Sequence, residues 1–161
     1  MRNIFVYDAN KKVIVEKVEK YRLLERQLAA LLEGEKDTVA KMANMAAVLH
    51  ETFGFWWTGF YRVAGDELIL GPFQGPVACM HIPFGRGVCG TAWKRNESVV
   101  VPDVEAFPGH IACSSASRSE IVVPVHGADG SVTAVLDIDS DRLATFDETD
   151  RVALERIVTL L

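Results

Sequence analysis

The feature that most constrains the fold is a pair of strand-like segments in the C-terminal third of the chain, 120–126 and 131–139. Both are rich in aliphatic and β-branched residues, which favour extended backbone. Between them lies Gly127-Ala128-Asp129-Gly130, a run of turn-forming residues. The pattern predicts an antiparallel hairpin with its two strands side by side.

Other segments extend this pattern into a complete domain. Strand-like runs also occur at 56–63, 67–71 and 98–102, and helical periodicity occurs at 11–32, 36–53, 87–96 and 147–161. The segments 72–86 and 103–119 are expected to be largely loop. Helices that flank a run of adjacent strands predict an α+β fold, with helices covering one side of a mostly antiparallel sheet. We expect one domain over residues 1–161, with a helical extension at 1–35 and a core at 36–161.

Composition excludes several classes of function. The 161 residues are 49% apolar and 24% charged, which is typical of a soluble globular domain. A net charge of −5 without a basic block argues against nucleic-acid binding. We see no apolar run of about 18 residues that would span a membrane, and no secretory signal at the start. We therefore expect a cytoplasmic protein whose thiols are kept reduced.

Three cysteines, Cys79, Cys89 and Cys113, lie in glycine-containing polar segments. An odd number is a poor framework for structural disulfides. A reactive thiolate that takes oxygen from a substrate becomes a sulfenic acid, which a second thiol converts to a disulfide. Cys113 has His110 three positions before it, and Cys89 begins the predicted helix at 87–96. Burial as small apolar side chains is the competing interpretation.

Acidic residues alternate with aliphatic ones on the second strand of the hairpin. Asp137 and Asp139 should point to the same face, roughly 7 Å apart. Glu120 starts the neighbouring strand and is expected to lie alongside them. Close, partly buried carboxylates raise one another's pKa, so that one of them could deliver a proton. Exposure of the pair on a solvated sheet surface remains the alternative.

Aromatic residues open the first strand. Alternation places Trp57 and Tyr61 on the opposite side from Trp56 and Phe60. One set is expected in the core, and the other set could line a pocket for an apolar or sulfur-bearing ligand.

A metal site is a weaker interpretation of the same segments. Soft ligands are available from Cys79-x-His81, from Cys89 and from His110-x-x-Cys113. No Cys-x-x-Cys pair is present, and the spacing matches no familiar zinc pattern. We expect no metal and no resident cofactor.

Taken together, six segments resemble one family, the free methionine-R-sulfoxide reductases, which are built on a single GAF domain. They are Trp-Thr-Gly-Phe-Tyr at 57–61, Leu-Gly-Pro-Phe-Gln-Gly-Pro-Val-Ala-Cys at 70–79, Gly-Val-Cys-Gly-Thr-Ala at 87–92, Phe-Pro-Gly-His-Ile-Ala-Cys at 107–113, Ser-Glu-Ile-Val-Val-Pro at 119–124 and Val-Leu-Asp-Ile-Asp-Ser at 135–140. The resemblance implies reduction of free methionine-R-sulfoxide to methionine, with thioredoxin as the external reductant and a homodimer as the common assembly.

The same resemblance implies a role for each matched residue. Cys113 corresponds to the nucleophile, Cys79 to the principal resolving cysteine and Cys89 to a third thiol that could replace it. Glu120, Asp137 and Asp139 correspond to acids that bind the amino acid and assist proton delivery, and Trp57 and Tyr61 to pocket aromatics. Two alternatives remain open at this point: a non-catalytic GAF sensor of a small molecule, and a metal-binding redox sensor.

Overall fold

The computed structural model describes the backbone of residues 9–111 and 116–161, with side chains from residue 14 onward. In these ranges the helices are α1 (Ala9–Leu31), α2 (Thr38–Phe53), α3 (Gly87–Arg95) and α4 (Glu148–Ile157), with short 3-10 turns η1 (Val104–Ala106) and η2 (Val158–Leu160). The strands are β1 (Trp57–Ala64), β2 (Glu67–Gln74), β3 (His81–Pro83), β4 (Val99–Val101), β5 (Ser119–His126) and β6 (Val132–Ser140). No helix in the described part of the chain is long and apolar enough to cross a bilayer.

The strands form one sheet in the order β3-β2-β1-β6-β5-β4, and each neighbouring pair is antiparallel. This confirms the expected α+β class and the hairpin of β5 and β6. The expected loop at 72–86 contains β3, and β2 runs past its predicted end to Gln74. Two residues of β2, Gly71 and Pro72, lie opposite Phe60 in a β-bulge, where the missing N–H of proline is tolerated.

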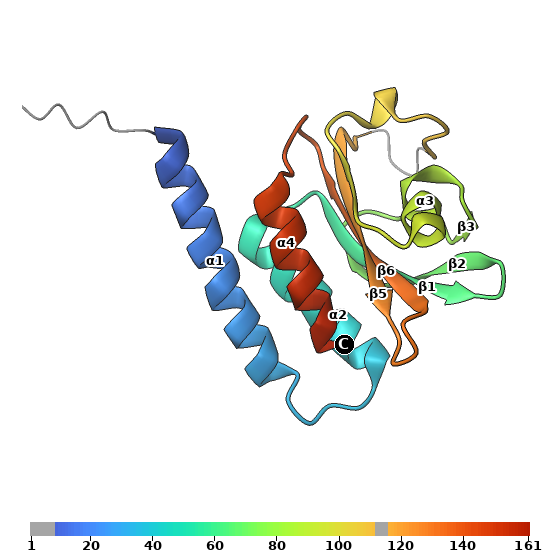
Figure 1. Cartoon of the computed structure of the whole chain (residues 1–161), viewed down its shortest axis with the longest axis horizontal. Helices are drawn as coiled ribbons and strands as arrows, with labels where there is room; N and C mark the ends of the chain where they lie inside the picture. The colour runs from blue at the N-terminus through green and yellow to red at the C-terminus, as the bar shows by residue number, and fades with distance from the viewer. Residues whose placement is uncertain (1–8, 112–115) are drawn as a thin grey trace, which may run out of the picture.

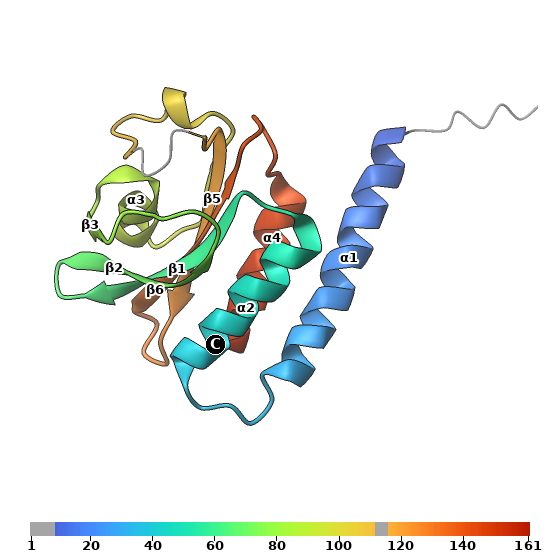
Figure 2. The same ribbon diagram turned by 180° about the vertical axis from the view of Figure 1, so that it is seen from behind.

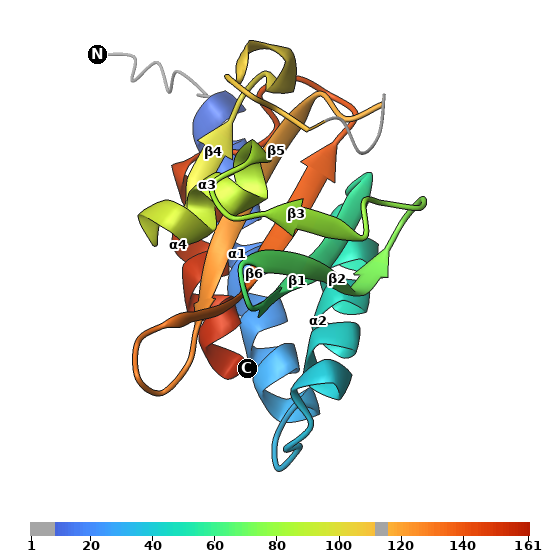
Figure 3. The same ribbon diagram turned by 90° about the vertical axis from the view of Figure 1, so that its right-hand side faces the viewer.

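Helices lie on both faces of the sheet, which corrects the expectation that they cover one side. Figure 1 shows α1, α4 and α2 together on one face, with α3 and the long loops on the other. The view from behind shows α2 between the sheet and α1 (Figure 2), and Figure 3 looks at the sheet with α3 in front of it. The layer that contains α3 is described further below.

The pleat of β5 and β6 divides their side chains between two cores. The face under α1, α2 and α4 holds Ile121, Val123, Leu136 and Ile138, each at most 1% exposed. Met42 and Met45 of α2 also belong to this core and are buried. The opposite face holds a smaller apolar cluster that includes Trp57, Tyr61, Cys89, Val122 and Val135.

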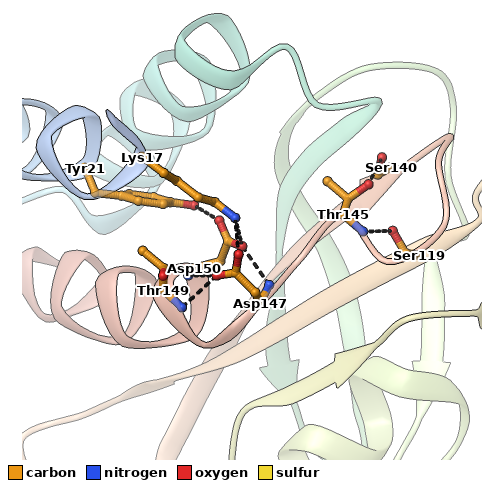
Figure 4. A network of polar contacts seen from close by, with 8 residues as sticks. All are labelled: Lys17, Tyr21, Ser119, Ser140, Thr145, Asp147, Thr149 and Asp150. Carbon is orange, nitrogen blue, oxygen red and sulfur yellow. Dashed lines mark hydrogen bonds and ion pairs between the residues drawn. The ribbon is translucent and has the colours of Figure 1, made fainter. Parts of the chain in front are cut away.

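A buried polar contact fastens α1 to α4 (Figure 4). Asp150, which is 0% exposed, accepts hydrogen bonds from the Tyr21 hydroxyl at 2.7 Å and from the Lys17 ammonium. Asp150 also accepts the backbone N–H of Asp147, while the Asp147 carboxylate accepts N–H groups of the first turn of α4. This reciprocal capping box fixes the start of α4, and the ion pair fixes α1 against it.

Candidate functional site

Strand pairing brings the three predicted acids to one place. Glu120 of β5 lies directly opposite Asp139 of β6, and Gly59 of β1 lies opposite Asp137. Because positions two apart on a strand share a face, Asp137 and Asp139 point to the same side, toward α3. The solvated alternative for the Asp137 and Asp139 pair is wrong for Asp137, which is 6% exposed, and Asp139 is half-buried. Glu120 is 5% exposed.

The acids line a cavity between the sheet, α3 and the segment before β5. Its wall contains all the described residues that the sequence proposed for the site except Cys79, namely Trp57, Tyr61, Cys89, Glu120, Asp137 and Asp139. The remaining wall is mainly apolar and includes Ile82, Val88 and Ile111. A concave, mostly apolar space with a few convergent polar groups is the usual form of a small-molecule site.

Burial and mutual repulsion shift the acids toward their protonated forms. Burial is the largest cause of a raised pKa at Glu120 and at Asp137, and the neighbouring carboxylates raise both further. Burial raises the pKa of Asp139 to about 6, against a lowering effect of the hydrogen bond from Ser117. The cavity therefore holds carboxyl groups able to keep a proton near neutral pH.

The polar groups of the cavity are only partly satisfied. Among the described residues, Asp137 Oδ1 has no hydrogen-bond partner although it is buried. His110 Nε2 lies 4.0 Å from Glu120 Oε2, and burial lowers the pKa of this histidine, which favours its neutral form. A buried carboxylate oxygen without a partner is costly, so it marks a place where a ligand can add a donor or a positive charge.

Cys89 faces the acids from the first turns of α3. Its Sγ lies 3.9 Å from Glu120 Oε1, and the residue is 3% exposed. Close packing explains this position, because a Cβ on Gly90 would stand 2.6 Å from the carbonyl oxygen of Pro83. Burial, followed by the charges of Asp137 and Glu120, raises the pKa of the Cys89 thiol. A helix N-terminus favours a thiolate, but desolvation and the carboxylates outweigh that effect at this position.

Two aromatic rings form the wall at β1. Trp57 and Tyr61 stack with ring centroids 5.9 Å apart, and the Tyr61 hydroxyl donates to the carbonyl oxygen of Cys79 at 3.0 Å. Gly59 lies between them, and a Cβ there would fall 2.5 Å from the indole ring of Trp57. The alternation therefore places Trp57 and Tyr61 in the cavity and Phe60 in the opposite core. Trp56, assigned by alternation to the same side as Phe60, precedes β1 and also lines the cavity.

The other two predicted cysteines are placed differently. Cys79 is partly buried in the segment before β3, next to Ala78, which lines the cavity. Cys113, the residue matched to the nucleophile, lies outside the described residues, as do its immediate neighbours. The structure thus brings Cys89 and the acids together, with Cys79 close to the aromatic wall.

Two polar residues of the site were not assigned a role in ligand binding from the sequence. Ser117 donates a hydrogen bond to Asp139 Oδ1, and His110 lines the cavity beside Glu120. Both lie in the segment 103–119, and its length as an expected loop was the signal that could have pointed to them. A nonlocal contact such as Ser117 with Asp139 requires knowledge of the strand register.

A metal ion has one possible position among the described residues. The ligand atoms of Cys89, Glu120 and Asp137 all lie within 4.8 Å of one another. Of the soft ligands considered from the sequence, only Cys89 belongs to this set. The side chain of His81, for example, is 57% exposed and contacts Glu67 instead.

The sequence and the fold were compared with those of known proteins. The family model described as GAF domain matches residues 35–161. The chain is 45% identical to the free methionine-R-sulfoxide reductase of Escherichia coli, covering 91% of this chain and 89% of the relative. It is 40% identical to the enzyme of that name from Saccharomyces cerevisiae, with coverages of 89% and 86%. The Neisseria meningitidis free methionine-R-sulfoxide reductase, solved in complex with its substrate, superposes with a TM-score of 0.87 at 55% identity, covering 89% of this chain and 87% of that one.

Proposed function

Because the chain belongs to the GAF-domain family of free methionine-R-sulfoxide reductases, we propose that it reduces free L-methionine (R)-S-oxide to L-methionine by thiol chemistry in the cavity beside α3. It is an oxidoreductase that acts on a sulfoxide. The single observation that carries the proposal is the convergence of Glu120, Asp137 and Asp139 with two aromatic rings in one cavity.

Recognition of the free amino acid is assigned to the acids. The substrate ammonium group needs a negative partner inside the cavity, and Asp137 Oδ1 is buried there without a partner among the described residues. An ammonium group placed beside Asp137 and Asp139 would offset their repulsion and keep them ionised. A peptide-bound sulfoxide has no such charge at that position, so it is expected to be rejected.

The aromatic wall is assigned to the sulfur end of the substrate. Thioether sulfur packs favourably against aromatic rings, and Trp57 and Tyr61 form a stacked pair in the wall. Charge at one end of the cavity and aromatic surface along it would hold the sulfoxide in one orientation.

The chemical step follows from the family match for Cys113. Its thiolate attacks the sulfoxide sulfur, the oxygen accepts a proton, and oxygen is transferred to Cys113 as a sulfenic acid while the thioether leaves. We assign the proton to Glu120. Its raised pKa keeps it protonated, and His110, three positions before Cys113, lines the cavity beside it. Substrate is reduced by two electrons, and the thiol is oxidised by two.

Regeneration is assigned to Cys79 and an external dithiol. Attack of Cys79 on the sulfenic acid forms a disulfide and releases water, and thioredoxin then reduces the disulfide. The choice of Cys79 over Cys89 is supported by burial, because Cys89 lies among carboxyl groups that raise the pKa of its thiol. A thiol held in its protonated form is a poor attacking group.

The proposal is tested by an assay that couples thioredoxin, thioredoxin reductase and NADPH to three separate substrates. Turnover is expected with the free R epimer and not with the free S epimer or with sulfoxide in a peptide. Turnover of peptide-bound sulfoxide at a similar rate would contradict an enclosed site that reads the ammonium group.

Cysteine variants separate the proposed roles. Cys113→Ser is expected to abolish methionine formation, whereas Cys79→Ser should release one equivalent of methionine per enzyme and then fail to cycle with thioredoxin. Cys89→Ser is expected to keep cycling. If Cys79→Ser cycled normally and Cys89→Ser did not, the resolving role would belong to Cys89.

The ammonium assignment has its own test. Asp137→Asn is expected to raise KM for the free sulfoxide at least about tenfold, the equivalent of about 1.4 kcal/mol of binding free energy. The N-acetylated sulfoxide, which lacks the charge, should be an equally poor substrate for wild type and variant. Asp129→Asn, in the exposed hairpin turn, serves as the matched control. An unchanged KM in Asp137→Asn would place the ammonium elsewhere.

Assembly and location are also proposed from the family. We propose a homodimer in the cytoplasm, where thioredoxin is available. Exposed apolar side chains on α1, among them Ile14 and Val15, support a covered face there. Light scattering coupled to size exclusion should give twice the chain mass of 17.8 kDa; a monomer at all concentrations would contradict the dimer.

A further inference from the structure

The cavity beside α3 brings together three carboxyl groups, and the described part of its wall contains no lysine or arginine. Glu120 and Asp137 are 5% and 6% exposed, and Asp139 is next to them on β6. Among the described residues of the cavity wall, His110 is the only basic side chain, and burial lowers its pKa. Asp137 Oδ1 has no partner in the described part of the chain. The carboxyl groups therefore offer buried ligand oxygens to a cation that replaces the protons they hold.

A thiol lies within reach of the same carboxylates. Cys89 Sγ is 3.9 Å from Glu120 Oε1, and the ligand atoms of Cys89, Glu120 and Asp137 lie within 4.8 Å of one another. A tetrahedral zinc ion with ordinary bond lengths separates its sulfur and oxygen ligands by about 3.5 Å. Small side-chain movements would bring the three atoms to that spacing.

The donor set selects the kind of ion. One thiolate with two carboxylates suits Zn²⁺, which is bound by sulfur and oxygen in four-coordinate sites. Mg²⁺ and Ca²⁺ prefer oxygen alone and gain nothing from Cys89. With three protein ligands, water would take the fourth position.

We propose that Cys89, Glu120 and Asp137 form a reversible site for Zn²⁺, and that its occupancy excludes the ammonium group of the amino-acid ligand. Binding releases to solvent the proton of the Cys89 thiol and those held by the carboxyl groups of Glu120 and Asp137, and forms one Zn–S and two Zn–O bonds with no change in oxidation state. The exclusion of amino acid rests on the proposed function, whereas the metal site itself does not. Free zinc is then an inhibitor that acts at the ligand-binding acids.

The binding test uses reduced protein, without a thiol reductant, and Co²⁺ as a spectroscopic substitute for Zn²⁺. Wild type is expected to bind one ion and to show a thiolate-to-cobalt charge-transfer band that Zn²⁺ removes. Cys89→Ser should lose the band and bind zinc at least about tenfold more weakly by calorimetry. Asp137→Asn should weaken zinc to a similar extent, which keeps the test informative if Cys89→Ser folds poorly.

Two controls locate the ion. Cys79→Ser keeps the buried site and should retain both the band and the zinc affinity. His126→Gln removes an exposed histidine at the far end of β5 and should also change nothing. Loss of the band in Cys79→Ser with retention in Cys89→Ser would overturn the proposal, and so would the absence of zinc binding to wild type.

The exclusion test uses Cys113→Ser, which removes the proposed nucleophile and leaves the three ligands intact. Free methionine sulfoxide should weaken zinc binding in this variant in proportion to its concentration, and the N-acetylated compound should not. Zinc binding without displacement would overturn the exclusion alone. Turnover in the thioredoxin assay is measured separately, so a failure of the metal site and a failure of the proposed function give different results.

Discussion

Replacement of Tyr21 by Phe tests the contact that fastens α1 to α4. The side chain is 1% exposed, and its hydroxyl donates to Asp150 Oδ1 at 2.7 Å. The ring contact with Phe53, at a centroid distance of 4.4 Å, is retained, so the variant loses only the volume of the hydroxyl group. A hydrogen bond to a charged group contributes about 1.5–3 kcal/mol. Lys17 and the N–H of Asp147 both bind Asp150 Oδ2, so the variant removes the contact that the buried Oδ1 makes with Tyr21. We therefore expect a loss of about 2–3 kcal/mol, and a Tm lower by about 4–12 °C.

Urea unfolding measures this loss as a lower midpoint with an unchanged m-value. The matched control is Arg22→Gln, also on α1, which breaks an ion pair with Glu19 between side chains that are 64% and 59% exposed; its effect should stay within about 0.5 kcal/mol. In an Asp150→Asn background the cost of Tyr21→Phe should shrink, because the two residues are coupled. Turnover at 25 °C should not change, since α1 lies on the opposite face of the sheet from α3 (Figure 1), which borders the cavity. Equal midpoints for Tyr21→Phe and Arg22→Gln would refute the reasoning.

Two further changes probe the cavity. Gly90→Ala should lower the free energy of unfolding in urea by about 1–3 kcal/mol, because the new Cβ would lie 2.6 Å from the carbonyl oxygen of Pro83. The control is Gly127→Ala, where the nearest atom is a methyl carbon of Thr133, and it should cost less. Equal costs would argue against tight packing of α3. Burial raises the pKa of Asp139 from 3.8 to about 6, so over this interval the folded state holds a proton that the unfolded chain releases, and stability falls as pH rises. Asp139→Asn should therefore gain stability relative to wild type between about pH 4 and 6; a difference in free energy of unfolding that does not vary with pH would contradict the shift.

The arrangement of the elements could be predicted to a large extent from periodicity and turn residues. The hairpin of β5 and β6 and the helices α1, α2 and α4 were expected within a few residues of their observed bounds. Periodicity does not indicate which face of a sheet a helix covers. The prediction that all helices lie on one face was therefore wrong for α3. β3 is a three-residue edge strand, too short to show a period of its own.

The site was less predictable because it depends on register and burial. The alternation in Val-Leu-Asp-Ile-Asp placed Asp137 and Asp139 on one face of the strand. Whether that face is exposed to solvent depends on the packing of α3 against it, which the alternation does not predict. The raised pKa of Cys89 has the same origin, because burial and two carboxylates outweigh the helix N-terminus. The assignment of Cys113 as nucleophile rests on the family match, since Cys113 lies outside the described residues.

The pleat of β6 explains how the chain tolerates such a cavity. Leu136 and Ile138, both 0% exposed, enter the apolar core under three helices, while Asp137 and Asp139 point to the other side. Each step along the strand thus adds either stabilising apolar burial or a carboxylate that costs free energy to bury. A cation in the cavity removes part of that cost only in the folded state, so ligand binding and stability are linked through the same atoms. The contact of Tyr21 with Asp150 stabilises the opposite layer, where it can offset this cost without touching the ligand.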